Sequence, residues 1–176
     1  MRLYTIGHGT RSIAEFVGML QERHIGLLVD VRAFPASRAN PQFNKEALSQ
    51  ALAAAGIDYQ HEPALGGRRR GLGDASPNLA WQHPAFRAYA DYMMTDEFWS
   101  AFDALLAQAA SCPTAIMCSE TLWWRCHRRL IADAAVARGA HVIHLLKTHS
   151  AAEHVLAPPA HVEGDRVTYS SLPVQR

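Results

Sequence analysis

The sequence contains no long hydrophobic run. Of its 176 residues, 49% are hydrophobic, which is typical of a globular protein, but no apolar stretch reaches the roughly 18 residues that a membrane-spanning helix needs. The N-terminal stretch MRLYTIGHGT also lacks the apolar segment of a secretory signal. We therefore expect a cytoplasmic protein without a membrane partner. A chain of this length is most simply one domain with a sizeable core.

Cysteine and lysine are both scarce. The three cysteines form an odd set without the spacing of a disulfide framework, so structural disulfides are not expected. Only Lys45 and Lys147 are lysines among the 17 basic residues. Arginine binds carboxylate and phosphate through two parallel hydrogen bonds, although an arginine-rich composition also arises from a GC-rich genome. The net charge of +1 argues against a strong general attraction to nucleic acid.

Common nucleotide-binding motifs and internal repeats are absent as well. The chain has no GxGxxG fingerprint and no repeat with a period of about 20 to 50 residues. The segment GGRRRG superficially resembles a phosphate-binding loop, but it lacks the Walker spacing and the terminal Lys-Ser/Thr pair. No common nucleotide-binding fold is therefore indicated by a motif.

Apolar runs alternate along the chain with amphipathic stretches. The apolar runs predict strands at 3–6, 25–31, 57–62, 114–118 and 141–146. The stretches between them predict helices from Ser12, which is an N-cap with Glu15 three residues on, and over about 45–55, 84–94, 96–110 and 125–138. This alternation favours a single α/β domain with a mostly parallel five-stranded sheet and helices on both faces. Residues 1–150 would form this domain and residues 151–176 an extended C-terminal tail or hairpin.

Ionisable side chains follow the predicted strands. In an open α/β sheet, ligands bind beyond the carboxyl ends of the strands. The groups that follow the first four strands are His8 with Arg11, Asp30 with Arg32 and Arg38, Glu62 with the loop from Gly66 to Arg70, and Cys118 with Glu120 and Arg125. The opposite ends of the strands carry little such chemistry. We therefore predict a binding or catalytic site at this edge of the sheet.

Cys118 is the candidate nucleophile. It ends a buried strand just before a predicted helix, and the thiolate rather than the thiol is the reactive species. A free thiol with a pKa near 8.5 is only about 3% ionised at pH 7, but Arg125 or Arg128 and the helix dipole would lower that pKa. Glu120 would oppose this effect if it faced the sulfur, so it is assigned to orienting an arginine or to acid–base chemistry. A strand-end cysteine is equally compatible with an inert, buried role.

Cys126 and His127 fall within the helix predicted over 125–138. Helical steps from Cys126 lead to Leu130 and Ala134, which favours core packing for its side chain. His127 is expected to cap a strand-end carbonyl or to enter the site. The spacing from Cys118 through Cys126 to His127 matches no zinc template, because adjacent helical residues diverge by about 100°. Neither a metal site nor a cofactor is predicted.

His8, Asp30 and Arg32 remain open between functional and structural roles. His8 lies between two glycines, which permit close approach of the backbone to a ligand, so it is a candidate general base, phosphate donor or turn residue. Asp30 and Arg32 are two residues apart on a strand and project on the same face, where they could simply pair with each other.

Two further groups of residues also have two interpretations. Arg38 and the run from Arg68 to Arg70 belong to polar loops, where they could bind an anion or remain solvated. Trp123 and Trp124 could stack on a base, or they could wedge the start of the predicted helix into the core.

Four segments together resemble a known family. YTIGHGTR, VDVRAFPASRANPQFN, IDYQHEPALGGRRRG and CSETLWWRCHRRLIADAAVARG are similar, in order and spacing, to the family catalogued as domain of unknown function 488, over about residues 3–146. The resemblance implies a compact α/β domain in the bacterial cytoplasm with its motif residues at one sheet edge, and it supplies no reaction. Those residues are His8, Asp30, Arg32, Pro35, Ser37, Arg38, Phe43, His61, Gly66, Gly67, Arg68, Cys118, Glu120, Cys126, His127 and Arg128. The chain departs from the family pattern at Gly9, where many members have serine, and at Trp123, where proline is common.

Two functions from different classes follow. In the first, Cys118 attacks an anionic, phosphorylated substrate, conceivably a nucleotide or a nucleic-acid end, with His8, Glu120 and Asp30 as further catalytic groups. The residues expected to bind the substrate are Arg32, Arg38, Gly66, Gly67, Arg68, Arg125, His127 and Arg128. In the second, the protein binds nucleic acid or a nucleotide without catalysis, through its arginine loops. The sequence sets no oligomeric state.

Overall fold

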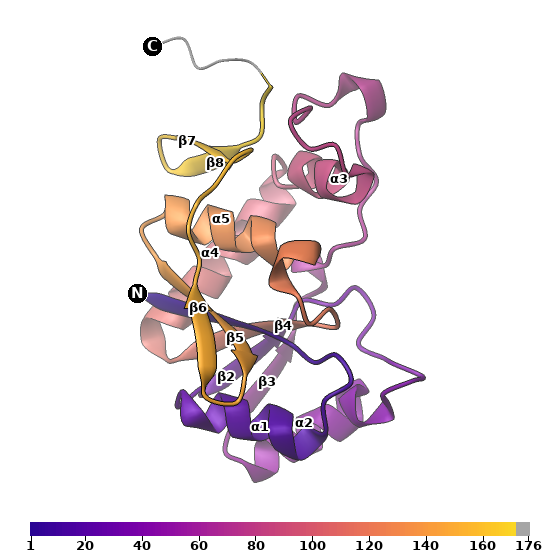
Figure 1. Cartoon of the computed structure of the whole chain (residues 1–176), viewed down its shortest axis with the longest axis vertical. Coiled ribbons are helices and arrows are strands. Elements are labelled where there is room, and N and C mark those ends of the chain that lie inside the picture. The colour runs from indigo at the N-terminus through magenta and orange to yellow at the C-terminus, as the bar shows by residue number, and fades with distance from the viewer. Residues whose placement is uncertain (172–176) are drawn as a thin grey trace.

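A six-stranded sheet forms the centre of the computed structural model, which describes residues 1–171 (Figure 1). Its strands are β1 (Arg2–Gly7), β2 (Leu27–Asp30), β3 (Asp58–His61), β4 (Thr114–Cys118), β5 (His141–Lys147) and β6 (Ser150–Glu153). The strand order is β3-β2-β4-β1-β5-β6, and every pair is parallel except β5 with β6. The α/β class with a mostly parallel sheet, predicted from the alternation of apolar runs and amphipathic stretches, is therefore confirmed.

Helices cover both faces of this sheet. They are α1 (Ile13–Glu22), α2 (Lys45–Ala54), α3 (Pro84–Tyr92), α4 (Asp96–Ser111) and α5 (Arg128–Ala137). In Figure 1, α1 and α2 lie on one side of the strands and α4 and α5 on the other. Short 3-10 helices occur at Pro41–Phe43, Pro63–Leu65, Gly73–Ala75 and Trp123–Arg125. The predicted cap of α1 is confirmed, because the Ser12 hydroxyl accepts a hydrogen bond from the Glu15 N–H at 3.1 Å.

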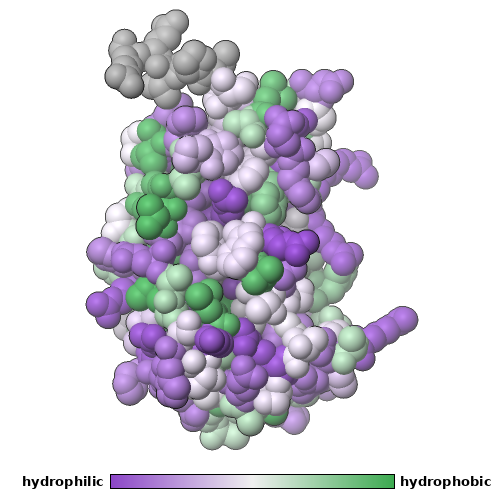
Figure 2. Space-filling model, viewed as in Figure 1, coloured by the Kyte–Doolittle hydropathy of each residue, from purple (hydrophilic) through white to green (hydrophobic). Residues whose placement is uncertain are grey.

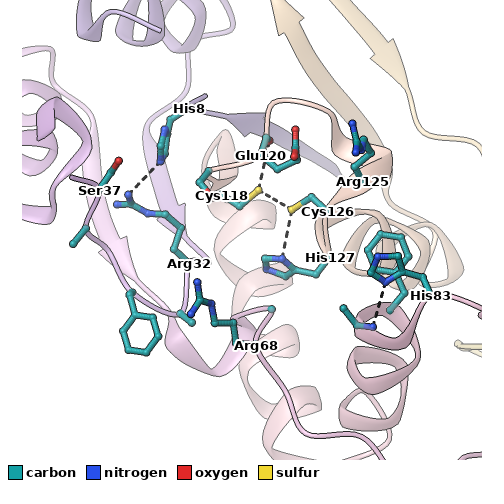
Figure 3. Close-up of a pocket in the computed structure, with 17 residues that line it drawn as sticks. His8, Arg32, Ser37, Arg68, His83, Cys118, Glu120, Arg125, Cys126 and His127 are labelled. Atoms are coloured by element: carbon teal, nitrogen blue, oxygen red, sulfur yellow. Dashed lines mark hydrogen bonds between the residues drawn. The ribbon is translucent and has the colours of Figure 1, made fainter. Parts of the chain in front are cut away.

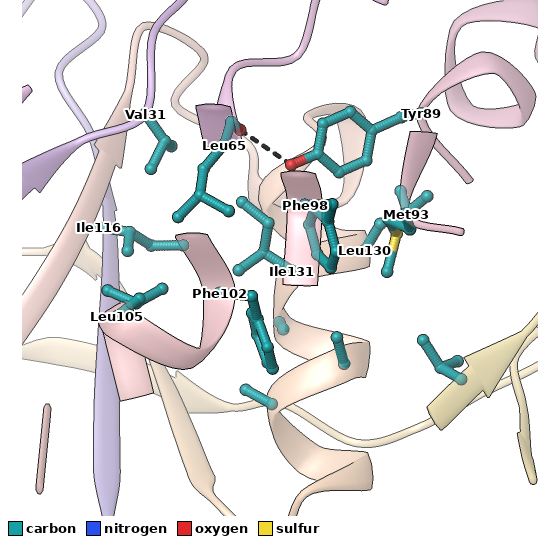
Figure 4. Close-up of a cluster of buried hydrophobic side chains, with 14 of the residues drawn as sticks. Val31, Leu65, Tyr89, Met93, Phe98, Phe102, Leu105, Ile116, Leu130 and Ile131 are labelled. Carbon is teal, nitrogen blue, oxygen red and sulfur yellow. Dashed lines mark hydrogen bonds between the residues drawn. The ribbon is translucent and has the colours of Figure 1, made fainter. Parts of the chain in front are cut away.

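The core is divided by the sheet into two apolar layers. Side chains alternate along each strand, so Leu28 packs with α1 and α2 while Val29 packs with the layer of α3, α4 and α5. The second layer is rich in aromatic rings. One of them, the buried Tyr89, donates a hydrogen bond from its hydroxyl to the Leu65 carbonyl at 2.8 Å (Figure 4). Cys118 ends β4 on this second face, so the core positions its sulfur beneath α5.

A strand that was not predicted and the start of one helix differ from the sequence-based prediction. The sheet has a sixth strand, β6, which the five-strand prediction missed because Ser-Ala-Ala-Glu lacks the β-branched and aromatic residues typical of strands. Helix α5 begins at Arg128 rather than near Arg125, because the chain forms a 3-10 turn first. The C-terminal segment forms the expected hairpin, with β7 (His161–Glu163) and β8 (Arg166–Thr168) paired around Gly164, whose φ is 67°.

None of the helices in residues 1–171 has both the length and the apolar character to cross a bilayer. Figure 2 shows one face of the molecule, on which polar side chains predominate and apolar ones form small, separate groups.

Candidate functional site

A cavity of about 450 Å³ lies at the carboxyl ends of β1, β2 and β4 (Figure 3). The register of the sheet brings these ends together, since Gly7 pairs with Cys118 and Asp30 with Met117. The wall of the cavity is built from His8, the loop after β2 from Arg32 to Ser37, Gly67 with Arg68, the start of α3 around His83 and Phe86, and the segments Cys118 to Glu120 and Arg125 to His127. This is the edge at which the sequence predicts a site.

Two sulfur atoms meet at this cavity. The Sγ atoms of Cys118 and Cys126 are 2.7 Å apart, against about 2.05 Å in a disulfide, and both residues are free cysteines. Both line the cavity, yet only 3% of Cys118 and 7% of Cys126 is exposed. The placement of Cys126 on a helix was wrong, because it lies between the 3-10 turn and Arg128, where α5 begins. It is buried as expected, but against Cys118.

Arg128 supplies a buried positive charge beside this pair. Its Nε donates to the Cys118 sulfur at 3.0 Å, and its terminal nitrogens donate to the Glu120 carbonyl and to the Thr5 hydroxyl oxygen. Only 1% of the residue is exposed, and no carboxylate within residues 1–171 forms an ion pair with it. A buried cation without a counter-charge is costly, so this environment favours an anion on the adjacent sulfur atoms.

His127 contacts the second sulfur. Its Nδ1 lies 3.4 Å from the Cys126 Sγ, and its Nε2 lies 3.1 Å from the Val31 carbonyl oxygen. Because a carbonyl only accepts, Nε2 must carry a hydrogen, which leaves Nδ1 either to receive the thiol proton or, when protonated, to donate to a thiolate. Gly67 makes room for this ring, since a Cβ at that position would lie 2.5 Å from Nδ1.

The two thiols differ in acidity. Burial, the hydrogen bond to Cys126 and the charge on that residue raise the pKa of the Cys118 thiol well above its usual value. Burial alone would also raise the pKa of Cys126, but the hydrogen bond from Cys118, the His127 ring and the Arg128 charge hold it well below the usual value. Of the two sulfur atoms, Cys126 is therefore the one whose thiolate is favoured, with Cys118 and Arg128 as its supporting neighbours.

His8 presents a basic nitrogen to the same cavity. Its Nδ1 donates to the Gly9 carbonyl at 2.9 Å, so Nε2 is the unprotonated nitrogen, and it faces a terminal nitrogen of Arg32 at 3.4 Å. The ring stacks on Phe43 with its centroid 4.4 Å away. Burial lowers the pKa of His8, and the positive charge of Arg32 lowers it further, so the ring is neutral near pH 7.

The carboxylate of Asp30 fixes the orientation of the Arg32 side chain. The Arg32 Nε and one terminal nitrogen donate to the Asp30 carboxylate at 2.9 and 2.7 Å, and Tyr59 donates to the same carboxylate at 2.6 Å. The pairing of Asp30 with Arg32 that the sequence allowed is present. Asp30 is fully buried and does not line the cavity, so it acts on the site through Arg32. The other terminal nitrogen of Arg32 remains directed toward His8 and the cavity (Figure 3).

The rim of the cavity is cationic and aromatic. Arg68 and Arg125 line it with exposed side chains, and neither forms an ion pair within residues 1–171. The Arg68 guanidinium lies 5.5 Å from the centroid of the exposed Phe34 ring. The carboxylate of Glu120 also lines the cavity, but it accepts the Leu122 N–H at 3.0 Å rather than binding an arginine.

Besides Asp30, three of the expected site residues do not line the cavity. Arg38 is exposed on the loop after β2 but does not line the cavity. Gly66 is buried behind Gly67, where a Cβ would meet the Ala33 backbone at 3.2 Å. Arg128 does not line the cavity but donates to the sulfur atoms of Cys118 and Cys126, which do. The remaining expected residues of the site, apart from Asp30, line the cavity together.

A buried chain of hydrogen bonds continues from Arg128 into the fold. The Thr5 hydroxyl lies 2.7 Å from the Nδ1 of His144, whose Nε2 lies 3.0 Å from the Nδ1 of His154. The Nε2 of His154 lies 2.7 Å from the Asp133 carboxylate, which also accepts from Tyr169 at 2.7 Å. Because the Asp133 carboxylate only accepts, a consistent direction of donation runs from the Thr5 hydroxyl through His144 and His154 to Asp133, while Tyr169 donates to the same carboxylate from the other side.

The sequence analysis missed this chain, which we call the Thr5–Tyr169 relay (Thr5, His144, His154, Asp133 and Tyr169). The sequence feature that could have indicated it is a polar residue within two otherwise apolar strands, Thr5 in β1 and His144 in β5. Trp123 covers the relay, because its ring stacks on His144 with centroids 4.0 Å apart. The interpretation of Trp123 as a wedge into the core therefore fits its position, whereas Trp124 is 45% exposed.

Residues 1–171 contain no group of three or more His, Cys, Asp or Glu side chains arranged to hold a metal ion.

The comparisons with known proteins give a family but no reaction. A model of the family described as Domain of unknown function DUF488 matches residues 12–135, which is more than half of the chain. Neither the curated proteins nor the solved structures gave a match. The matched segment contains both cysteines of the pair and Arg128, whereas His8 and most of the Thr5–Tyr169 relay lie outside it.

Proposed function

Because the chain belongs to the family described as Domain of unknown function DUF488, whose description names no reaction, we propose a function from the cavity itself: a thiol enzyme that acts on an anionic substrate. The attacking group is the thiolate that Cys118 and Cys126 share. The observation that carries this proposal is the contact between two cavity-lining sulfur atoms, one of which, that of Cys118, also accepts from the buried guanidinium of Arg128.

The environment of the pair is that of an activated nucleophile. A thiol becomes reactive when positive charge or a neighbouring imidazole stabilises its thiolate, and here Arg128 and His127 do so from two sides. A second thiol adds to this effect, because Cys118 can donate its hydrogen to the Cys126 sulfur. Purely structural cysteines need none of these partners.

The charges around the cavity favour an anionic substrate. Arg32 directs one terminal nitrogen toward His8 and the cavity, Arg68 and Arg125 stand at the rim without an ion pair in residues 1–171, and among those residues only Glu120 brings a carboxylate to the wall. Guanidinium groups bind phosphate and carboxylate oxygens in bidentate fashion. The Nε2 of His8 is the nitrogen on this wall that can take a proton from an attacking or departing group.

The decisive experiment measures alkylation of each cysteine by iodoacetamide as a function of pH, with the modified peptides quantified by mass spectrometry. Cys112 precedes β4 at the opposite edge of the sheet and serves as the internal reference. We expect Cys126 to be alkylated with a midpoint well below the pKa of about 8.5 of a free thiol. A midpoint at or above that value for both Cys118 and Cys126 excludes the proposal.

The alternative function, non-catalytic binding of a nucleotide or nucleic acid, is favoured by the exposed Phe34 beside Arg68. An aromatic ring next to a guanidinium suits a base and its phosphate. This function predicts an affinity for single-stranded nucleic acid that falls steeply with salt and that survives replacement of Cys126 by serine. Binding that is insensitive to salt contradicts it.

A further inference from the structure

The two sulfur atoms at the cavity have a property that a single nucleophile does not need. Cys118 and Cys126 come from different elements, the end of β4 and the turn before α5, yet their Sγ atoms are 2.7 Å apart without being bonded. A shift of well under 1 Å would bring them to the separation of a disulfide, which is about 2.05 Å. The fold therefore holds a dithiol in a position from which it can close.

We propose that Cys118 and Cys126 are a redox-active pair that reduces a hydroperoxide and closes to an intramolecular disulfide. This activity rests on the reactive thiolate of the proposed function but not on its anion-binding arginines. The roles of the two sulfur atoms follow from their surroundings. Cys126 has His127 at its sulfur and is the more exposed of the two, which suits the attacking thiolate. Cys118 lies deeper against Arg128, which suits the resolving thiol.

The first step forms a sulfenic acid. The Cys126 thiolate attacks the terminal oxygen of the hydroperoxide, the O–O bond breaks, and the departing alkoxide takes a proton to leave as the alcohol. The imidazole of His127, whose Nδ1 lies 3.4 Å from the Cys126 sulfur, is positioned to deliver that proton. Cys126 is oxidised in this step, and the hydroperoxide is reduced.

The second step forms the disulfide. The Cys118 sulfur attacks the sulfenyl sulfur of Cys126, the S–O bond breaks, and hydroxide combines with the Cys118 proton to leave as water. Two thiols and one hydroperoxide thus give one disulfide, one alcohol and one water. An external dithiol returns the pair to its reduced state by exchange.

The surroundings of the pair tolerate both states. When the thiolate is lost, Arg128 still donates to the Glu120 and Thr121 carbonyls and to the Thr5 hydroxyl, so its hydrogen bonds do not all depend on the sulfur. The cavity of about 450 Å³ provides room beside the sulfur atoms for a small hydroperoxide and later for a reducing thiol.

The test uses the full chain, fully reduced and freed of reductant, and one equivalent of tert-butyl hydroperoxide. We expect the intact protein to lose two hydrogen atoms by mass and a proteolytic digest to yield a peptide linked between Cys118 and Cys126. Treatment with dithiothreitol should restore the original mass. Cys112→Ser should behave as the wild type, since Cys112 lies at the opposite edge of the sheet.

The variants assign the roles. Cys118→Ser should form no disulfide and should accumulate a sulfenic acid at Cys126 that dimedone traps. Cys126→Ser should consume the hydroperoxide at least about thirtyfold more slowly at pH 7, because an ordinary thiol is only about 3% ionised there and burial makes Cys118 less acidic than that. A wild-type protein that gains oxygen at Cys126 without forming the link overturns the redox proposal.

The outcome also separates the two proposals. A low alkylation midpoint without disulfide formation rejects the redox pair and leaves the thiol enzyme in place. A midpoint at or above about 8.5 rejects both, because neither reaction then has its thiolate.

Discussion

At the scale of single residues, the site depends on side chains that hold other side chains. Asp30 fixes Arg32, and Gly67 leaves the space into which His127 turns toward Cys126. Arg128 has almost no exposed surface and still donates a hydrogen bond to the Cys118 sulfur. The chemistry of the cavity is therefore set by contacts that begin outside its wall.

The glycine at position 67 provides a direct test of the contact between His127 and Cys126. In Gly67→Ala, the new Cβ would lie 2.5 Å from Nδ1 of the imidazole, so the ring must move away from the sulfur. We expect the midpoint for alkylation of Cys126 to rise toward the free-thiol value of about 8.5. Gly18→Ala is the control, because a Cβ there meets nothing within 4 Å and alanine favours a helix. An unchanged midpoint in Gly67→Ala removes His127 from the account of thiol acidity.

Arg68 and Arg70 form a matched pair for testing anion binding. Both are exposed arginines of the same loop, but only Arg68 lines the cavity. If inorganic phosphate occupies the cavity, it should slow alkylation of Cys126. Arg68→Ala should raise the half-protective phosphate concentration about tenfold, the effect of losing about 1.4 kcal/mol of binding. Arg70→Ala should leave it unchanged. Equal effects of the two substitutions would point to diffuse attraction rather than to a site.

At the scale of elements, the Thr5–Tyr169 relay joins parts of the chain that are distant in sequence. It connects β1 and β5 of the sheet with Asp133 on α5, His154 just after β6 and Tyr169 just after β8. All five residues are buried, so each unsatisfied group would cost free energy. Through its hydrogen bonds, the relay therefore connects the C-terminal segment to α5, the helix that carries Arg128.

Asp133→Asn tests how much these hydrogen bonds contribute to stability. The substitution removes the charged acceptor of the hydrogen bonds from His154 and Tyr169, and such bonds contribute about 1.5–3 kcal/mol each. We expect the free energy of unfolding, measured in urea, to fall by about 3 kcal/mol or more. Asp103→Asn on α4 is the control, because Asp103 is an exposed partner of Arg138 and such ion pairs contribute about 0–1 kcal/mol. Comparable losses in the two variants would mean that the relay does not stabilise the fold.

At the scale of the whole molecule, the buried His144 makes stability depend on pH. His144 is almost completely inaccessible, and burial, together with the charge of His154, lowers its pKa to about 3. In the unfolded chain the same ring has an ordinary pKa of about 6.5. Between these two values the unfolded state binds more protons than the folded state, so acidification destabilises the fold.

The slope of the free energy of unfolding against pH can be measured. From about pH 6.5 downward, His144 should reduce the free energy of unfolding by at most about 1.4 kcal/mol per pH unit. His144→Gln removes this titration, so the difference in stability between the wild type and this variant should shrink as the pH falls from 7 to 5. Urea unfolding at each pH gives that difference. A constant difference across the range contradicts burial of a neutral imidazole.

The sequence by itself determined the fold class and most of the helix and strand positions. Apolar runs of strand length between amphipathic stretches are a local property, and so are the Ser12 cap and the Gly164 turn. Because parallel strands end at one edge, the same pattern also predicted that His8, Arg32 and Cys118 would face a common cavity, as they do.

Only the tertiary structure decided what those residues contact. Cys126 reaches Cys118 because the chain makes a 3-10 turn before α5, a one-turn difference that a helical pattern does not reveal. The Thr5–Tyr169 relay and the pairing of β6 join residues far apart in the sequence, and their local sequence is compatible with other structures. Burial supplies the physical reason: in the interior, polar groups must find partners, and which partners are within reach is set by packing.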